Sequence, residues 1–299
     1  MKSHVFLLGG GTRLAAHLGV LRAIEEQFGP IAAWAGASAG SLVAAVRASG
    51  FNHEMAVDLM MDTNYRQFFD VRPLGLIRGY GLCSGKKFEK WLDSVLCGIC
   101  FEDLDVPLAI VCSDVETGEP YIFSKEKTPK IKVATGVRCS ISIPGVFAIR
   151  PVNGDILIDG SLAKVDPTML FPTDHAPSIV VRMLRDRVAK LMNRRGFGFS
   201  TYVQRVADMI LDATEDRISP ELWTHDVLIR TGHHSPVNFD IAEDGRRELF
   251  QLGYEQCLQH LRPEEDVRSK HDDDAVLGPQ WVREDGPPEL KISYLENHA

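Results

Sequence analysis

The sequence predicts an α/β fold in which a mostly parallel central sheet is flanked by helices in three layers. Short runs rich in β-branched and aromatic residues alternate with stretches at helical spacing as far as Leu261. Strands that alternate with helices in this way form parallel sheets covered on both faces. The composition, 44% hydrophobic and 25% charged, is that of an ordinary globular chain.

The first 48 residues repeat one unit, a strand followed by a glycine-rich turn and a helix. A strand is predicted over residues 4–8, glycines break it at 9–11, and apolar residues at 14, 18, 21 and 24 then recur at helical spacing. A second strand over 31–35 runs into Gly36-Ala37-Ser38-Ala39-Gly40 and a helix over 41–48.

The rest of the chain continues the alternation. Residues 51–100 are predicted to be mainly helical, interrupted by a turn-rich stretch over 72–85, and to form a cap-like insertion beside the site. Further strands are predicted over 107–112, 121–123, 156–158, 178–183 and 227–230, and a final amphipathic helix over 246–261.

Charge is unevenly distributed between the two ends of the chain. Residues 263–299 contain ten acidic and four basic residues, which is most of the net charge of -8. We therefore expect one domain over residues 1–262 and an acidic, flexible tail over 263–299. A negative chain does not suit nucleic acid as a partner, because phosphate binding needs a positive face.

Neither a cleavable signal nor a membrane span is recognisable. The apolar run within residues 1–8 is too short for a signal peptide, and no later run reaches about 18 apolar residues. A cytoplasmic location is expected, unless export follows a route without a cleavable signal.

The six cysteines, at 83, 97, 100, 112, 139 and 257, suggest buried thiols rather than a disulfide framework. Cys97 and Cys100 form a single CxxC without a second ligand pair. A zinc or redox site is therefore the less favoured alternative, and no metal or cofactor is predicted.

The first candidate for chemistry is Ser38, in the pattern Gly36-x-Ser38-x-Gly40. A nucleophile elbow has this pattern, because a sharp strand-to-helix turn lifts the serine hydroxyl to the edge of the sheet. The alternative is a plain helix-starting turn, but the position between a predicted strand and a helix favours the elbow.

A serine nucleophile needs donors for an oxyanion and a base. The turn Gly9-Gly10-Gly11-Thr12-Arg13 precedes a helix and can expose backbone amides at the positive end of its dipole. The alternatives are a structural turn or a nucleotide cradle, but the turn lacks GxGxxG spacing and a GK[ST] ending.

The base is less evident from local sequence. Asp159 ends a predicted strand and is followed by Gly160, which also suits an ordinary turn aspartate. None of the ten histidines has a setting that stands out, and Ser38 comes too early in the chain for the Ser, Asp, His order of an α/β-hydrolase.

Taken together, the GGGTR turn, the GASAG elbow and the Asp159-Gly160 pair resemble the patatin-like phospholipase family in kind and in order. The segments over 105–109 and 114–119 and the stretch over 140–147, which contains an SIPGVF-like segment, are similar as well. The resemblance is strong over residues 4–168 and weaker to about 261.

This resemblance implies a Ser–Asp dyad without histidine, with Ser38 as nucleophile and Asp159 as base. It also implies an oxyanion hole around Gly10, Gly11, Thr12 and Arg13, and hydrolysis of lipid acyl esters without a metal. Two positions depart from the family pattern. Leu14 replaces a common glycine and could weaken the oxyanion hole, and Ser161 adds a hydroxyl able to alter the basicity of Asp159.

The expected substrates are phospholipids or lysophospholipids. One alternative is the same chemistry on an acyl thioester or a neutral glyceride, and another is a lipid-binding or regulatory protein with weak turnover. The sequence does not indicate an oligomeric state.

The most basic stretch, residues 182–199, is a candidate for peripheral membrane contact. If its centre is helical, Leu184, Val188, Leu191 and Met192 share one face, and basic side chains project elsewhere. A core-packed helix with a solvated basic face is the favoured alternative.

Overall fold

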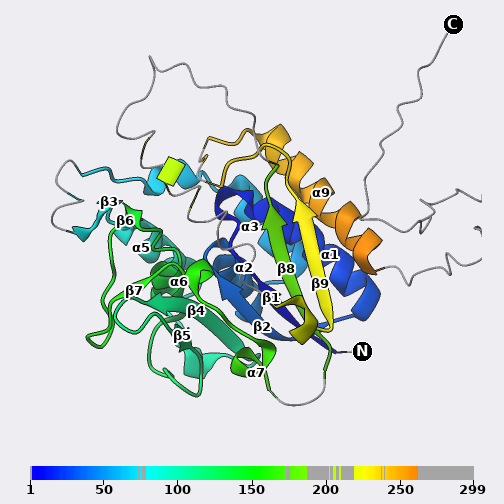
Figure 1. Cartoon of the computed structure of the whole chain (residues 1–299), viewed down its shortest axis with the longest axis horizontal. Coiled ribbons are helices and arrows are strands. Elements are labelled where there is room, and N and C mark those ends of the chain that lie inside the picture. The colour runs from blue at the N-terminus through cyan, green and yellow to red at the C-terminus, as the bar shows by residue number, and fades with distance from the viewer. Residues whose placement is uncertain are drawn as a thin grey trace, which may run out of the picture. The chain divides into compact units, whose positions relative to one another are not determined.

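The structure is a computed structural model that describes residues 2–72, 75, 79–172, 176–186, 202, 205–206, 209, 219–236, 238 and 240–261 (Figure 1). These residues belong to one compact unit, Met1–Leu261. The predicted tail over 263–299 lies outside the described residues.

The predicted strands and helices occur in the predicted order, together with short elements that the sequence analysis did not predict. The strands are β1 (Ser3–Leu7), β2 (Ile31–Ala37), β3 (Gly81–Cys83), β4 (Leu108–Asp114), β5 (Pro120–Phe123), β6 (Gly145–Phe147), β7 (Leu157–Ile158), β8 (Ser178–Leu184) and β9 (His225–Arg230). The α-helices are α1 (Leu14–Phe28), α2 (Ala39–Ala48), α3 (His53–Asp62), α5 (Lys86–Val95), α6 (Val133–Ser140), α7 (Pro167–Leu170) and α9 (Glu243–Leu261). Short 3-10 helices are η1 (Gly11–Arg13), η2 (Tyr65–Phe68), η3 (Phe101–Asp103), η4 (Gly160–Leu162) and η7 (Pro220–Leu222).

The central sheet is mostly parallel, as predicted. Its strands lie in the order β5-β4-β2-β1-β8-β9, and β7 pairs with β4 in addition (Figure 1). The pairs among β4, β2, β1, β8 and β9 are parallel, and only β5 and β7 run antiparallel to β4. The carboxyl ends of β1, β2 and β8 therefore meet at one edge, where ligands bind in open α/β sheets.

Both faces of the sheet are covered, because successive strand residues point to opposite sides. In β1, Val5 and Leu7 join a large cluster with residues of α1, α2 and α9. Phe6 and the following Leu8 join a second cluster, whose other members include Phe171 and Trp223. The resulting layers hold the sheet edge rigidly in place.

Two short strands were not predicted. β3 and β6 pair in parallel as a separate two-stranded sheet, and β3 lies within a stretch predicted as turns. Each strand has three residues and begins with glycine, so neither shows a pattern by itself. Their pairing depends on contacts made only in the folded chain.

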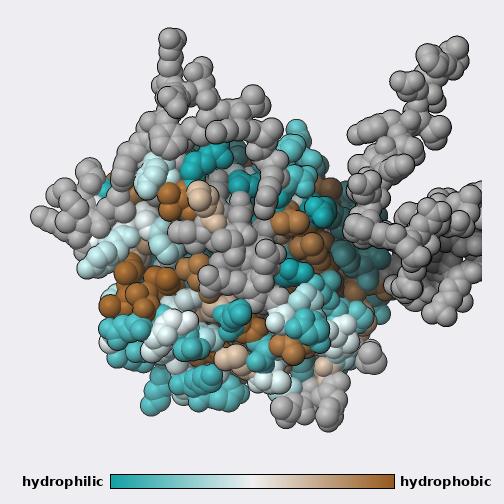
Figure 2. All heavy atoms as spheres, viewed as in Figure 1, coloured by the Kyte–Doolittle hydropathy of each residue, from teal (hydrophilic) through white to brown (hydrophobic). Residues whose placement is uncertain are grey.

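Among the described residues, no helix is long and apolar enough to cross a membrane. On the face in Figure 2, apolar residues occur in patches between hydrophilic ones.

Candidate active site

Ser38 lies at a strained turn between β2 and α2. Its backbone has φ 51° and ψ -127°, a left-handed conformation that costs a non-glycine residue about 1–3 kcal/mol. The glycines on either side are required by close packing. A Cβ on Gly36 would lie 2.4 Å from the Ser41 Cα, and one on Gly40 would lie 2.0 Å from the Leu7 carbonyl oxygen. The chain therefore has the geometry of a nucleophile elbow.

Strand pairing brings Asp159 to Ser38. Ala37, the last residue of β2, pairs with Val111 of β4. β7 pairs with the next part of β4, with Ile158 opposite Ser113. Pro120 of β5 pairs with Ser113 on the other side of β4, so β7 must lie on the same side of β4 as β2. There β7 runs antiparallel to β4, whereas β2 runs parallel to it. The residues that follow β2 and β7 consequently meet head to head.

The two side chains are hydrogen-bonded and buried. Ser38 Oγ donates to Asp159 Oδ2 over 2.8 Å, and the residues are 2% and 0% exposed. In the described part of the chain, no histidine takes part in the hydrogen bonds of either residue.

Three serines fix the backbone around this pair. Ser140 Oγ accepts the Ser38 amide at 2.9 Å and donates to the Val111 carbonyl at 2.6 Å. Ser113 Oγ donates to the Asp159 carbonyl at 2.9 Å, and the Asp159 amide donates to the Ser142 carbonyl at 3.1 Å. Sequence reasoning gave these serines no role. Ser140 and Ser142 lie in or beside the SIPGVF-like segment, which was the available signal.

Burial raises the pKa of Asp159 from 3.8 to about 6, because the charged carboxylate loses its hydration. Hydrogen bonds from the Ser161 amide, over 2.9 Å, and from the Ser38 hydroxyl oppose this effect. A carboxyl with this pKa is ionised near neutral pH and more basic than an ordinary aspartate, as a general base requires.

Ser161 places a second hydroxyl beside the pair. Its side chain is buried, and it lies near enough to Asp159 to help lower the pKa of that carboxyl, yet Oγ makes no hydrogen bond within the described structure. It faces Gly9, where a Cβ would lie 2.0 Å from Ser161 Oγ and 3.2 Å from Ser38 Cβ. The departure at position 161 therefore lies at the centre of the site.

Some backbone amides of the predicted oxyanion turn already donate hydrogen bonds within the fold. The Thr12 amide donates to the Pro236 carbonyl at 2.8 Å, and the Arg13 amide donates to the Gly10 carbonyl at 3.1 Å. The Arg13 side chain is also turned inward, with Nε bonded to the Gly10 carbonyl over 2.9 Å. Among the described residues, the amides of Gly10 and Gly11 have no partner. The amides of Gly10 and Gly11 are therefore the remaining candidates in this turn for donors to an oxyanion.

A third amide was missed by the sequence analysis. Ala39 is the first residue of α2, and within the described chain its amide has no partner. It follows the nucleophile directly, as an oxyanion donor does at other nucleophile elbows. The GxSxG pattern itself was the signal that could have identified it.

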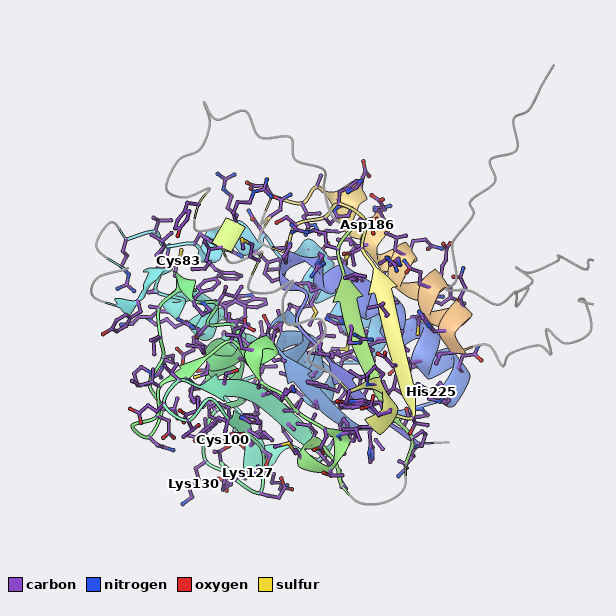
Figure 3. The ribbon with its side chains drawn as sticks, in the orientation of Figure 1. Cys83, Cys100, Lys127, Lys130, Asp186 and His225 are labelled. Atoms are coloured by element: carbon purple, nitrogen blue, oxygen red, sulfur yellow. The ribbon has the colours of Figure 1, made fainter. Side chains whose placement is uncertain are left out.

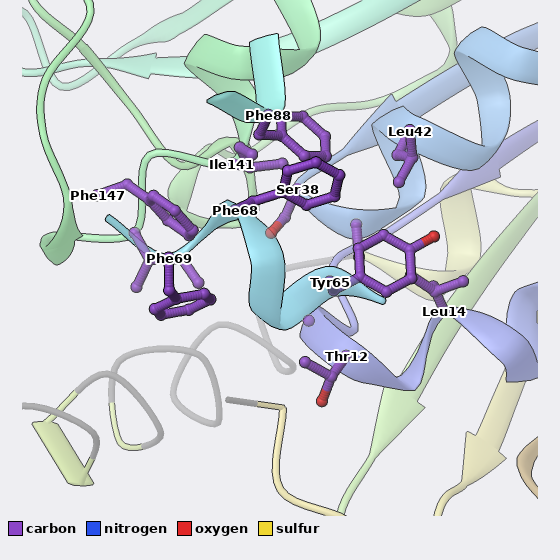
Figure 4. A pocket seen from close by; sticks show the side chains of 13 residues that line it. Thr12, Leu14, Ser38, Leu42, Tyr65, Phe68, Phe69, Phe88, Ile141 and Phe147 are labelled. Carbon is purple, nitrogen blue, oxygen red and sulfur yellow. The ribbon is translucent and has the colours of Figure 1, made fainter. Parts of the chain in front are cut away.

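An apolar pocket of about 70 Å³ opens at Ser38. Figure 4 shows Phe69 and Phe147 on one side of Ser38, Leu14 and Tyr65 on the other, and Phe88 above it. Leu14, the second departure from the family pattern, thus forms part of the wall. Such a lining favours the hydrocarbon of an acyl chain over a polar group.

The cysteines form no second site in the described residues. All six are free thiols, and Figure 3 shows Cys83 and Cys100 well apart, with Cys100 near Lys127 and Lys130. No group of three metal-ligating side chains occurs in this part of the chain.

The basic stretch over 182–199 is described only as far as Asp186. Leu184 is the last residue of β8, so the predicted helical face that includes it is wrong. The β8 pattern of apolar residues extends one residue further than expected, since Leu184 pairs with Arg230 of β9. Residues 187–199 lie outside the described residues.

Comparisons with known proteins find similar sequences. The model of the patatin-like phospholipase family matches residues 5–172. An NTE family protein of Mycobacterium tuberculosis is 31% identical over 170 residues, which cover 54% of this chain and 43% of the relative. YqhO of Bacillus subtilis is 27% identical over 270 residues, covering 82% of this chain and 93% of the relative.

The fold also has a solved counterpart. VipD from Legionella pneumophila is similar with a TM-score of 0.62 and 14% identity, over 87% of this chain and 66% of that one. This likeness concerns the fold alone. The match covers less than half of the mycobacterial relative's own length.

Proposed function

We propose that this chain, which belongs to the patatin-like phospholipase family, is a serine hydrolase of lipid acyl esters with Ser38 as nucleophile and Asp159 as base. The observation that carries the proposal is the 2.8 Å hydrogen bond between Ser38 Oγ and Asp159 Oδ2 at a strained elbow. The apolar pocket at Ser38 supports an acyl chain as the group that is recognised.

In the first half of the reaction, Asp159 Oδ2 takes the Ser38 proton as Oγ attacks the carbonyl carbon of the ester. The carbonyl oxygen becomes an oxyanion, which the amides of Gly10, Gly11 and Ala39 stabilise. When this intermediate collapses, the bond to the leaving alcohol breaks, and the alcohol oxygen takes the proton from Asp159. An acyl group remains on Ser38.

In the second half, Asp159 removes a proton from water as the water oxygen attacks the acyl carbon. Collapse releases the fatty acid, and Ser38 Oγ recovers its proton from Asp159. Both halves need the same ionised carboxylate, so one buried aspartate is sufficient for the cycle.

We further propose that residues 51–100 act as a cap over the acyl pocket within a hydrolase domain over 1–262. Tyr65, Phe68, Phe69 and Phe88 come from this stretch and line the pocket. The cap would therefore set which acyl chains fit. The tail over 263–299 stays a prediction from sequence.

A fluorophosphonate probe tests the nucleophile. We expect rapid labelling of the parent and of a Ser49→Ala control, since Ser49 lies at the far end of α2. Ser38→Ala should not be labelled, and its ester turnover should fall by roughly 10³-fold or more. Labelling that survives in Ser38→Ala would overturn the assignment.

A substrate panel then separates the rival functions. Release of fatty acid from phospholipids, with deacylation followed over time, supports the proposal. Faster turnover of acyl thioesters or neutral glycerides would favour the first rival. Acylation of Ser38 without turnover would favour a lipid-binding protein.

A further inference from the structure

A second, more polar pocket of about 380 Å³ adjoins the acyl pocket. Thr12, Leu14 and Tyr65 line both, so the two pockets share one wall. In Figure 4 these three residues lie on the side of Ser38 away from Phe69 and Phe147. An ester held at Ser38 with its acyl chain among the phenylalanines would direct the rest of the molecule toward the second pocket.

The second pocket carries an excess of positive charge. Its charged residues are Arg66, Asp240 and Arg246. Arg66 Nη1 pairs with Asp240 Oδ1 at 2.8 Å, and both side chains are largely exposed. Arg246 has no carboxylate partner among the described residues. The pocket therefore has one uncompensated cation.

Arg246 is held in place by one end of its guanidinium. Nη1 donates to the carbonyls of Met61, at the end of α3, and of Thr63, the latter at 3.3 Å. Nε is buried and has no partner in the described chain. A fixed guanidinium with an unused donor is preorganised for an anion, because the anchoring bonds have already restricted its motion.

Tyr65 contributes a second unused donor. Its hydroxyl is buried without a partner in the described residues, and burial raises the pKa of Tyr65 far above its usual value, so the proton stays in place. A buried donor without a partner costs about 1–3 kcal/mol, and an acceptor oxygen that displaces the atoms covering the hydroxyl would recover this free energy.

Two asparagines add to the donor set. Asn64 Oδ1 accepts the Arg66 amide and Asn238 Oδ1 accepts the Asp240 amide, which turns each carbonyl oxygen inward to the chain. Their side-chain NH₂ groups make no hydrogen bond in the described part of the structure. The lining thus offers donors and one spare positive charge, as a phosphate group requires.

We propose that this second pocket binds the phosphate of a glycerophospholipid whose acyl ester lies at Ser38, with Arg246 and Tyr65 as the principal donors. The inference rests on the proposed function and names the part of the substrate that a neutral glyceride lacks. It makes Arg246 a specificity-determining residue on α9, outside the segments that carry the catalytic pair.

The test measures binding in Ser38→Ala protein, so that it does not depend on turnover. A short-chain lysophospholipid and a monoacylglycerol with the same acyl chain are titrated in parallel below their micelle concentrations. We expect Arg246→Met to reduce the preference for the lysophospholipid by about 10- to 100-fold, the effect of one lost charge-assisted hydrogen bond. Arg247→Met is the matched control, since Arg247 is the next residue of α9, is exposed and lines neither pocket.

Asp240→Asn is a second variant, chosen because its expected effect is tighter binding, which a misfolded protein would not show. It removes the competing carboxylate and should tighten lysophospholipid binding by about two- to fivefold, as for an exposed charge pair. Equal losses for both lipids in Arg246→Met, or no gain in Asp240→Asn, would overturn the subsite. Inorganic phosphate that binds as tightly as the lysophospholipid would also overturn it, in favour of a free-phosphate site. Failure of Ser38 labelling in the parent would instead count against the hydrolase itself.

Discussion

Replacing Asp159 by asparagine should stabilise the protein at alkaline pH while abolishing hydrolysis. Burial raises the pKa of Asp159 from 3.8 to about 6, so its ionisation is less favourable in the folded chain than in the unfolded one. With about 1.4 kcal/mol for each pKa unit, the ionised carboxylate costs the folded state about 3 kcal/mol. Asparagine has a similar shape, keeps an oxygen for the Ser161 amide and carries no charge.

The sign of this effect follows from proton binding. Below pH 3.8 the carboxyl is protonated in both states and imposes no penalty. Between pH 3.8 and about 6 the folded state binds more protons than the unfolded state, so stability falls as pH rises, and the loss is complete above about pH 6. Asp159→Asn should therefore gain up to about 3 kcal/mol over the parent at pH 8 and almost nothing at pH 4.

Urea denaturation at pH 4, 6 and 8 measures this difference. Asp58→Asn is the matched control for an aspartate-to-asparagine change, because Asp58 is exposed on α3. A free energy of unfolding for Asp159→Asn that is below the parent at pH 8, or a difference that does not vary with pH, would refute the reasoning. In the same samples, ester hydrolysis by Asp159→Asn should be lost.

Four further outcomes are expected. The kcat/KM of the parent should fall about tenfold per pH unit below pH 6, because only ionised Asp159 accepts the Ser38 proton; a flat profile from pH 4 to 8 in a stopped pH-jump assay would exclude it as the base. Ser140→Ala should lower kcat by roughly 10-fold or more with little change in KM, since it frees the backbone of the nucleophile; rescue by Ser140→Thr would separate the hydroxyl from packing. Activity should persist in excess chelator, and a rate that calcium or zinc restores would contradict this. Changing Arg187, Lys190, Arg194 and Arg195 to glutamine should reduce co-sedimentation with anionic vesicles if the basic stretch contacts membranes; equal binding at low and high salt would leave the core-packed alternative.

The sequence predicted the strands and glycine turns well because their signals are local. Most of β4, from Leu108 to Cys112, is an unbroken apolar run, and the elbow at Ser38 is a five-residue pattern. β3 and β6 escaped prediction because three residues give no periodicity. The polar pocket was not predicted from the sequence for a related reason. Tyr65 and Arg246 are 181 positions apart, and only the packing of α9 against the end of α3 places them together.

The backbone amides around Ser38 also show that local sequence does not reveal contacts with distant parts of the chain. A glycine-rich turn predicts that backbone donors are exposed, but it does not say which of them the rest of the fold will use. Here the Pro236 carbonyl occupies the Thr12 amide, from a segment more than 200 positions away. The glycine-rich turn therefore predicted more candidate donors than the described structure leaves without a partner.

In the proposed dyad, burial would allow a carboxylate to serve where many hydrolases use histidine. The pKa of Asp159, about 6, lies close to the usual value of about 6.5 for histidine, so both are mostly free of a proton at neutral pH and similarly basic. The basicity costs stability, and the site offsets this cost with bonds that do not neutralise the charge. Ser113 and Ser142 hold the backbone of Asp159. Among the described residues, the Ser161 amide and the Ser38 hydroxyl donate hydrogen bonds to its carboxylate, and the Ser161 side chain lies close enough to lower its pKa as well. A further donor to that carboxylate would stabilise the fold and weaken the base. The Ser161 side chain already lowers the pKa of Asp159 without a full hydrogen bond to it, and a full hydrogen bond would weaken the base further.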